Sequence, residues 1–123
     1  MAFLTDRKRA TGLGASKTGT EHHWQTQISS IALLILTPLF LLTFGPMLGE
    51  SHEAVVAHFA RPYPAVITGL MLVVGFSHFR HGVQVLLEDY TQGLTRKLSI
   101  IAMACLSYGA MAVGLFALVK LAL

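Results

Sequence analysis

His78 is followed eleven and twelve residues later by Asp89 and Tyr90, at the end of a strongly apolar part of the chain. Because α-helical residues eleven apart return to one face, a single helix would present an imidazole within a membrane and an acid beside a phenol near its exit. Gly82, one turn after the histidine, falls on the same stripe. Ionisable groups inside a membrane are costly and usually functional. The spacing therefore predicts a buried ligand together with proton chemistry at the membrane edge.

The composition is that of a membrane protein. Of 123 residues, 54% are hydrophobic and 12% are charged, which is roughly half the charged share of an ordinary soluble domain. Three long apolar stretches predict transmembrane helices at residues 24–48, 64–90 and 98–121, after a polar tail at residues 1–23. We therefore expect an all-α membrane fold with no room for a separate catalytic domain.

The connections predict how the chain crosses the membrane. Residues 50–61 are expected to form a short interfacial helix with Ser51 as its N-cap, and Pro38 is expected to bend the first span. Basic residues gather in the tail and in the connection at residues 91–97, which predicts that both face the cytoplasm or the equivalent matrix side. They are Arg7, Lys8, Arg9, Lys17, Arg96 and Lys97. The chain would then be a multi-pass protein of the inner (cytoplasmic) membrane with its N-terminus inside.

Two other classes of function find little support. The basic residues are not interleaved with aromatic ones, so nucleic-acid binding is not expected. Cys105 is the single cysteine, which excludes an internal disulfide and a cluster of thiolate metal ligands.

An imidazole roughly 16–18 Å from Tyr90 along the helix axis has two interpretations. His78 can hydrogen-bond to a neighbouring helix, or it can ligate the iron of a haem. Gly82 favours the haem, because a residue without a side chain leaves room for a flat macrocycle.

A haem held by two histidines needs a second axial ligand, which this chain is not expected to supply. His81 lies three residues from His78 on the same helix, so the two cannot bind opposite faces of one iron. The other histidines are expected to lie too far from His78 along the membrane normal: His22 and His23 at one rim, His52 and His58 at the other. The second ligand, and further helices around the haem, would come from another polypeptide.

Further polar side chains on the second span suggest a pocket. Arg80 and His81, next to Gly82, are candidates for the haem-propionate side, where cationic groups would offset negative charge. Alternatively, Arg80 reaches a polar partner helix or a water-filled crevice. Tyr90 can donate a hydrogen bond to a quinone carbonyl, and Asp89 can relay a proton. The alternative for this last pair is an interfacial tyrosine anchor beside a solvated acid.

The segment at residues 78–90, His-Phe-Arg-His-Gly-Val-Gln-Val-Leu-Leu-Glu-Asp-Tyr, resembles the smaller haem-binding membrane anchor of succinate dehydrogenase, respiratory complex II. The shared pattern is a histidine, a glycine four residues on, and Asp-Tyr eleven and twelve residues on. The three-span plan and the chain length agree with this family. Residues 4–9 and 19–24 are similar to those of its alphaproteobacterial members.

The resemblance implies that His78 is an axial ligand of haem b, with the other ligand on the larger cytochrome b anchor subunit. Tyr90 would hydrogen-bond ubiquinone, and Asp89 would lie beside it in the proton path. The quinone pocket would be shared with the larger anchor and the iron–sulfur subunit. Electrons would come from succinate at the flavoprotein subunit and pass through the iron–sulfur subunit. No role transfers to Arg80 or His81, because family members vary there.

The resemblance also places the start of the first span on the side where the iron–sulfur subunit docks. His22, His23 and Trp24 are therefore candidates for docking or for the rim of the pocket, or else form an ordinary amphipathic entry into the membrane. Two other functions stay open: an anchor of another quinone-linked complex such as fumarate reductase, and a membrane scaffold without a cofactor.

Overall fold

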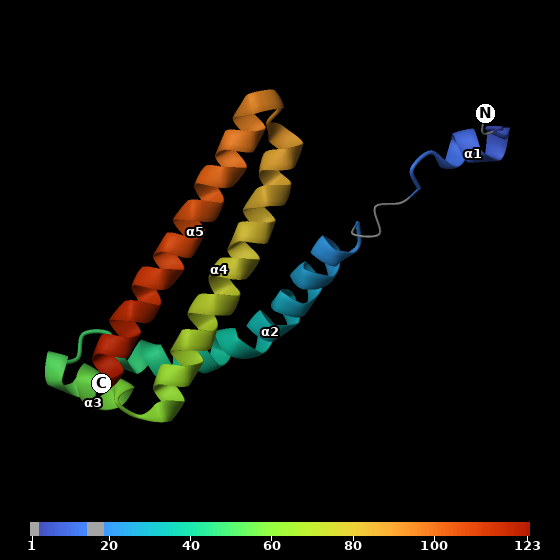
Figure 1. The fold of residues 1–123 in the computed structure, drawn as a ribbon. Helices are drawn as coiled ribbons and strands as arrows, with labels where there is room; N and C mark the ends of the chain where they lie inside the picture. Colours follow the sequence, from blue (N-terminus) through green and yellow to red (C-terminus); the bar gives the residue numbers. More distant parts are fainter. Residues whose placement is uncertain (1–2, 15–18) are drawn as a thin grey trace.

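Three long helices dominate the computed structural model, which describes residues 3–14 and 19–123 (Figure 1). They are α2 (Glu21–Phe44), α4 (Pro62–Tyr90) and α5 (Gly93–Ala122). Each is long and apolar enough to cross a membrane. The predicted all-α class with three membrane-spanning helices is confirmed, and no strand occurs in residues 3–14 or 19–123.

Three short elements complete the chain: α1 (Asp6–Thr11), the 3-10 helix η1 (Gly45–Met47) and α3 (His52–Phe59). The last is the short helix expected between the first two spans. The Ser51 hydroxyl caps it by accepting a hydrogen bond from the Ala54 backbone N–H at 3.3 Å, which satisfies one of the free donors of the first turn.

The N-terminal segment is more helical than its polar, glycine-rich sequence predicted. It contains α1, capped by the Thr5 hydroxyl, and residues 21–23 already belong to α2. Residues 1–2 and 15–18 of the predicted tail, with the basic Lys17, lie outside the described residues.

The turn between α4 and α5 is tighter than the predicted connection at residues 91–97. It consists of Thr91 and Gln92, because α5 begins at Gly93. Gly93 has a φ of +61°, a conformation that glycine adopts without steric cost. The Arg96 side chain then donates from Nε to the Thr91 carbonyl at 2.7 Å. A loop expected from polar residues is therefore mostly the first turn of a helix.

Helix α4 is the central element, with α5 and α2 packed against it (Figure 1). Helices α4 and α5 approach closely at Gly114 of α5, where an added Cβ would lie 3.2 Å from the Leu72 methyl carbons. Small residues at such crossings let helices approach closely inside a membrane. Pro38 lies inside α2, which bends along its course in Figure 1, as a proline that removes a helical hydrogen bond predicts.

Replacing Gly114 by isoleucine is expected to push α5 away from α4. Overpacking of this kind costs about 1–3 kcal/mol of the free energy of unfolding, and it should appear as a lower thermal midpoint of the purified complex. Gly109→Ile is the matched control on the same helix, because an added Cβ there meets nothing within 4 Å. An equal loss of stability in both variants would contradict the close contact.

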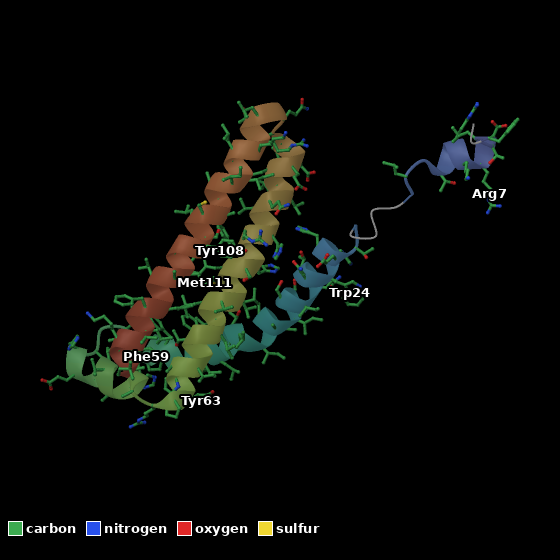
Figure 2. The ribbon with its side chains drawn as sticks, viewed as in Figure 1. Arg7, Trp24, Phe59, Tyr63, Tyr108 and Met111 are labelled. Atoms are coloured by element: carbon green, nitrogen blue, oxygen red, sulfur yellow. The ribbon has the colours of Figure 1, made fainter. Side chains whose placement is uncertain are left out.

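Few apolar side chains are buried within this chain. Among the described residues these are Leu36, Phe59 and Ile67. Most large apolar side chains point outward along the helices (Figure 2), and such a surface needs lipid or partner helices to cover it. The chain is an integral multi-pass membrane protein, and Trp24, 63% exposed at the start of α2, has the position of an interfacial aromatic residue.

Candidate functional site

His78 lies on α4, half-buried, and is held from α2. Its Nδ1 atom is 2.9 Å from the Ser29 hydroxyl oxygen. Ser29 is itself tied to its own helix, since its hydroxyl lies 2.8 Å from the Gln25 carbonyl oxygen and 2.9 Å from that of Thr26. The Nε2 atom of His78 makes no hydrogen bond to any residue within 3–14 or 19–123. One ring nitrogen is therefore occupied, and the other is available to a ligand.

Gly75 and Gly82 flank His78 on one side of α4. We call the surface formed by these three residues the open face. The glycines are three residues before and four residues after the histidine, so all three share a stripe of the helix. An added Cβ at either glycine would meet no heavy atom within 4 Å. Beside Gly75 is an apolar cavity of about 380 Å³, lined by Phe40, Met71, Leu72, Gly75, Phe76 and Phe79. A flat, apolar group bound at Nε2 would have room here.

His81 and Arg80 contact the two helices that pack against α4. His81 is 9% exposed, and its ring centroid lies 5.0 Å from that of His22 on α2. The Arg80 guanidinium is 2.9 Å from the His81 Nε2 atom, and its central carbon lies 5.5 Å from the centroid of the Tyr108 ring on α5. The His81 ring thus lies between α4 and α2, and the Arg80 guanidinium lies between α4 and α5.

The contact between His22 and His81 corrects the position predicted for His22. We expected it at a rim, far from His78 along the membrane normal, whereas its ring contacts a residue one turn from His78. The reason is stagger. Helix α4 has 29 residues, about 43 Å at the rise of an α-helix, and α2 begins near His81, in the second half of α4, rather than beside its end (Figure 1).

A second cavity, of about 300 Å³, lies between α2 and α4. Ser29 and His81 both line it, with Gln25, Ile28, Ala32, Val73, Val74 and Ser77. The Ser29–His78 hydrogen bond therefore lies next to this cavity between the two helices.

Asp89 and Tyr90 form the last turn of α4 and are exposed. Tyr90 is 82% exposed, and neither side chain is hydrogen-bonded to another described residue. Their neighbour Glu88 accepts a hydrogen bond from Gln84 at 2.9 Å. Twelve residues separate Tyr90 from His78, roughly 18 Å along the helix axis. The structure thus keeps the imidazole and the acid–phenol pair on one helix but at two separate places.

No group of three or more His, Cys, Asp or Glu side chains in the described part of the chain is arranged to hold a metal ion by itself. A haem iron needs fewer ligands from the protein, because the porphyrin supplies four and the protein supplies the remaining one or two. A single imidazole with a free nitrogen can supply one of them.

The sequence did not predict a role for Ser29 or Gly75, and it predicted the wrong position for His22. A serine in an apolar helix usually bonds back to its own backbone, so its type alone gives no sign of a histidine partner 49 residues away. Gly75 was detectable, because it lies on the stripe already defined by His78 and Gly82.

The comparisons with known proteins bear on the whole chain. A family model described as succinate dehydrogenase/fumarate reductase transmembrane subunit matches residues 2–119. The chain belongs to this family. The match confirms the resemblance found in the segment at residues 78–90 and extends it across all three long helices.

Two relatives in the succinate dehydrogenase/fumarate reductase family are each named succinate dehydrogenase hydrophobic membrane anchor subunit. The protein from Paracoccus denitrificans is 42% identical over 123 residues, which is 100% of this chain and 95% of that protein. The protein from Rickettsia bellii is 28% identical over 89 residues, 72% of this chain and 70% of that protein. No solved structure gives a significant match.

Proposed function

We propose that this chain is the smaller hydrophobic membrane anchor of a succinate dehydrogenase, where it co-ligates haem b and forms part of the ubiquinone-reduction site. Family membership and the names of both relatives support the assembly. The observation that carries the haem assignment is the free Nε2 atom of His78 between two glycines that leave the helix surface open.

The residues of the open face fit a haem. His78 would bind the iron through Nε2, while Gly75 and Gly82 admit the edge of the macrocycle without a clash. The aromatic side chains of the adjoining cavity would contact its apolar surface. When bound, haem b supplies a one-electron redox centre within the membrane.

A partner must complete this site, because a six-coordinate iron needs a ligand on each side. In the proposed assembly that ligand belongs to the larger cytochrome b anchor subunit, whose helices would cover the open face. The iron–sulfur subunit and the flavoprotein subunit are the soluble partners, and succinate is oxidised on the latter. His22, His23 and Trp24, at the start of α2, are the residues we assign to the side that faces the iron–sulfur subunit.

Asp89 and Tyr90 are the residues that we assign to ubiquinone. The Tyr90 hydroxyl would donate a hydrogen bond to a quinone carbonyl oxygen, and its exposure leaves it free to do so. Asp89, equally exposed, would pass protons from the aqueous side as the quinone is reduced. Both lie at the end of a helix about 43 Å long. Because the hydrocarbon core is about 30 Å thick, one end of this helix reaches water.

Arg80 would supply positive charge next to the haem site, and His81 would hold the guanidinium in place by accepting a hydrogen bond at Nε2. Their hydrogen bond and the cation–π contact with Tyr108 fix the guanidinium in the seam with α5. In that place the guanidinium would offset negative charge on a haem propionate or at the edge of the quinone pocket.

The proposed location is the inner (cytoplasmic) membrane, with the N-terminus in the cytoplasm. Three spans put the start of α2 and the turn between α4 and α5 on the same side. Basic residues lie at both places, in the N-terminal segment and at Arg96 and Lys97, and such residues favour the cytoplasmic side.

Purification of the intact complex through this chain tests the proposal. We expect a flavoprotein and an iron–sulfur protein to co-purify, succinate-dependent quinone reduction, and a haem b signal in the reduced-minus-oxidised visible spectrum. A colourless complex would instead support a cofactor-free scaffold. A haem-containing complex that reduces fumarate far faster than it oxidises succinate would indicate the fumarate reductase alternative, which the family description also covers.

A further inference from the structure

We infer that Ser29 is a positioning residue for the haem ligand: its hydroxyl accepts the Nδ1 proton of His78, and this fixes both the tautomer and the orientation of the imidazole. The inference rests on the proposed function, in which Nε2 of the same ring binds iron. It concerns a residue on a different helix from the ligand, 49 positions earlier in the chain.

The direction of the hydrogen bond follows from a count of protons. The Ser29 hydroxyl has one hydrogen and three oxygen or nitrogen neighbours within 2.9 Å: the carbonyls of Gln25 and Thr26, and Nδ1 of His78. Carbonyl oxygens only accept hydrogen bonds. The hydroxyl hydrogen therefore points to its own helix, and the Ser29 oxygen accepts from His78. A neutral His78 then carries its proton on Nδ1 and a lone pair on Nε2.

This arrangement prepares the ring for iron before any haem binds. In the opposite tautomer, Nε2 would carry a hydrogen and could not bind the metal. A ligating histidine generally donates its second ring N–H to a neighbouring acceptor, which orients the ring and makes the ligand more basic. A more basic ligand stabilises the oxidised iron, and so lowers the reduction potential of the haem.

Ser30 shows that the contact is specific to one of two adjacent serines. The Ser30 hydroxyl donates to the Thr26 carbonyl at 2.8 Å, as Ser29 does to its own helix, but it is exposed and makes no hydrogen bond to His78. Both serines occupy interior positions of α2, and alanine is a better helix former at either place. Ser30→Ala is therefore a matched control that removes the same back-bond without touching the histidine.

The test compares Ser29→Ala, Ser29→Thr and Ser30→Ala in the intact complex. The readouts are the midpoint potential of the haem by redox titration, the low-spin ferric EPR signal, and haem content per flavin. We expect Ser29→Ala to shift the potential upward, to alter the EPR signal, and to lower haem affinity by about 10–100-fold, the usual effect of losing such a partner. Ser29→Thr keeps a hydroxyl and should restore the original values, and Ser30→Ala should match the unmodified complex.

The outcomes distinguish the positioning role of Ser29 from the assignment of His78 as the haem ligand. An unchanged potential and EPR signal in Ser29→Ala would overturn the positioning role, as would equal shifts in Ser29→Ala and Ser30→Ala, while His78 would stay the proposed ligand. Retention of a normal haem spectrum in His78→Leu would instead overturn the ligand assignment itself, and the role of Ser29 with it.

Discussion

His78→Leu is expected to remove most of the haem from the complex. Leucine has nearly the volume of the lost ring but no atom that can bind iron, and loss of even a supporting partner of a metal ligand costs 10–100-fold in affinity. We therefore expect haem content per flavin to fall by more than about tenfold. Quinone reduction should fall less, because Asp89 and Tyr90 lie at a separate place near the end of α4.

Two other histidines serve as controls in this experiment. His52→Leu changes an exposed residue at the start of α3, and haem content should stay normal. His22→Leu is the more informative control, because the His22 ring lies against His81, close to the depth of His78. Normal haem in His22→Leu agrees with a second axial ligand on the partner subunit. Loss of the low-spin spectrum in that variant would mean that this chain supplies both ligands.

The room beside His78 allows an independent test of whether the haem lies on the open face. Gly82→Leu adds a side chain to the open face, where nothing within this chain obstructs it. The helix should therefore fold as before, while the haem is excluded. A complex with Gly82→Leu and a normal haem spectrum would show that the macrocycle does not lie on this face.

Tyr90→Phe is expected to lower the rate of quinone reduction by about tenfold and to leave the haem spectrum unchanged. The substitution removes one hydroxyl, and a neutral hydrogen bond contributes about 0.5–1.5 kcal/mol, where 1.36 kcal/mol corresponds to a factor of ten in rate. The haem should be unaffected, because Tyr90 is roughly 18 Å from His78 along the helix axis. Steady-state reduction of ubiquinone by succinate measures the rate, and an optical spectrum reports the haem.

Tyr63→Phe is the matched control for this loss. Tyr63 is also exposed on α4, at 59%, but it lies in the first turn, at the opposite end of the helix (Figure 2). The Tyr63→Phe complex should reduce quinone at the same rate as the unmodified complex. A stable Tyr90→Phe complex with full activity would remove the quinone assignment and leave Tyr90 as an interfacial anchor.

The sequence by itself determined the fold class and the stripe that carries the chemistry. Runs of apolar residues longer than a bilayer needs leave few alternatives to membrane helices, since every backbone polar group must be satisfied within the segment. Helical periodicity then places His78, Gly82 and Asp89 on one face from their spacing alone. Both conclusions depend on local geometry, and the family match agrees with the first of them.

The tertiary structure decided which groups of different helices meet. The stagger of α2 against α4 brings Ser29 to His78 and His22 to His81, and it left our prediction for His22 wrong. The turn between α4 and α5 has two residues, fewer than predicted. It is closed by the positive φ of Gly93 and by the hydrogen bond from Arg96 to the Thr91 carbonyl, and residue types reveal neither. Helix lengths follow from composition, whereas the offset between packed helices follows from how particular side chains fit at each crossing.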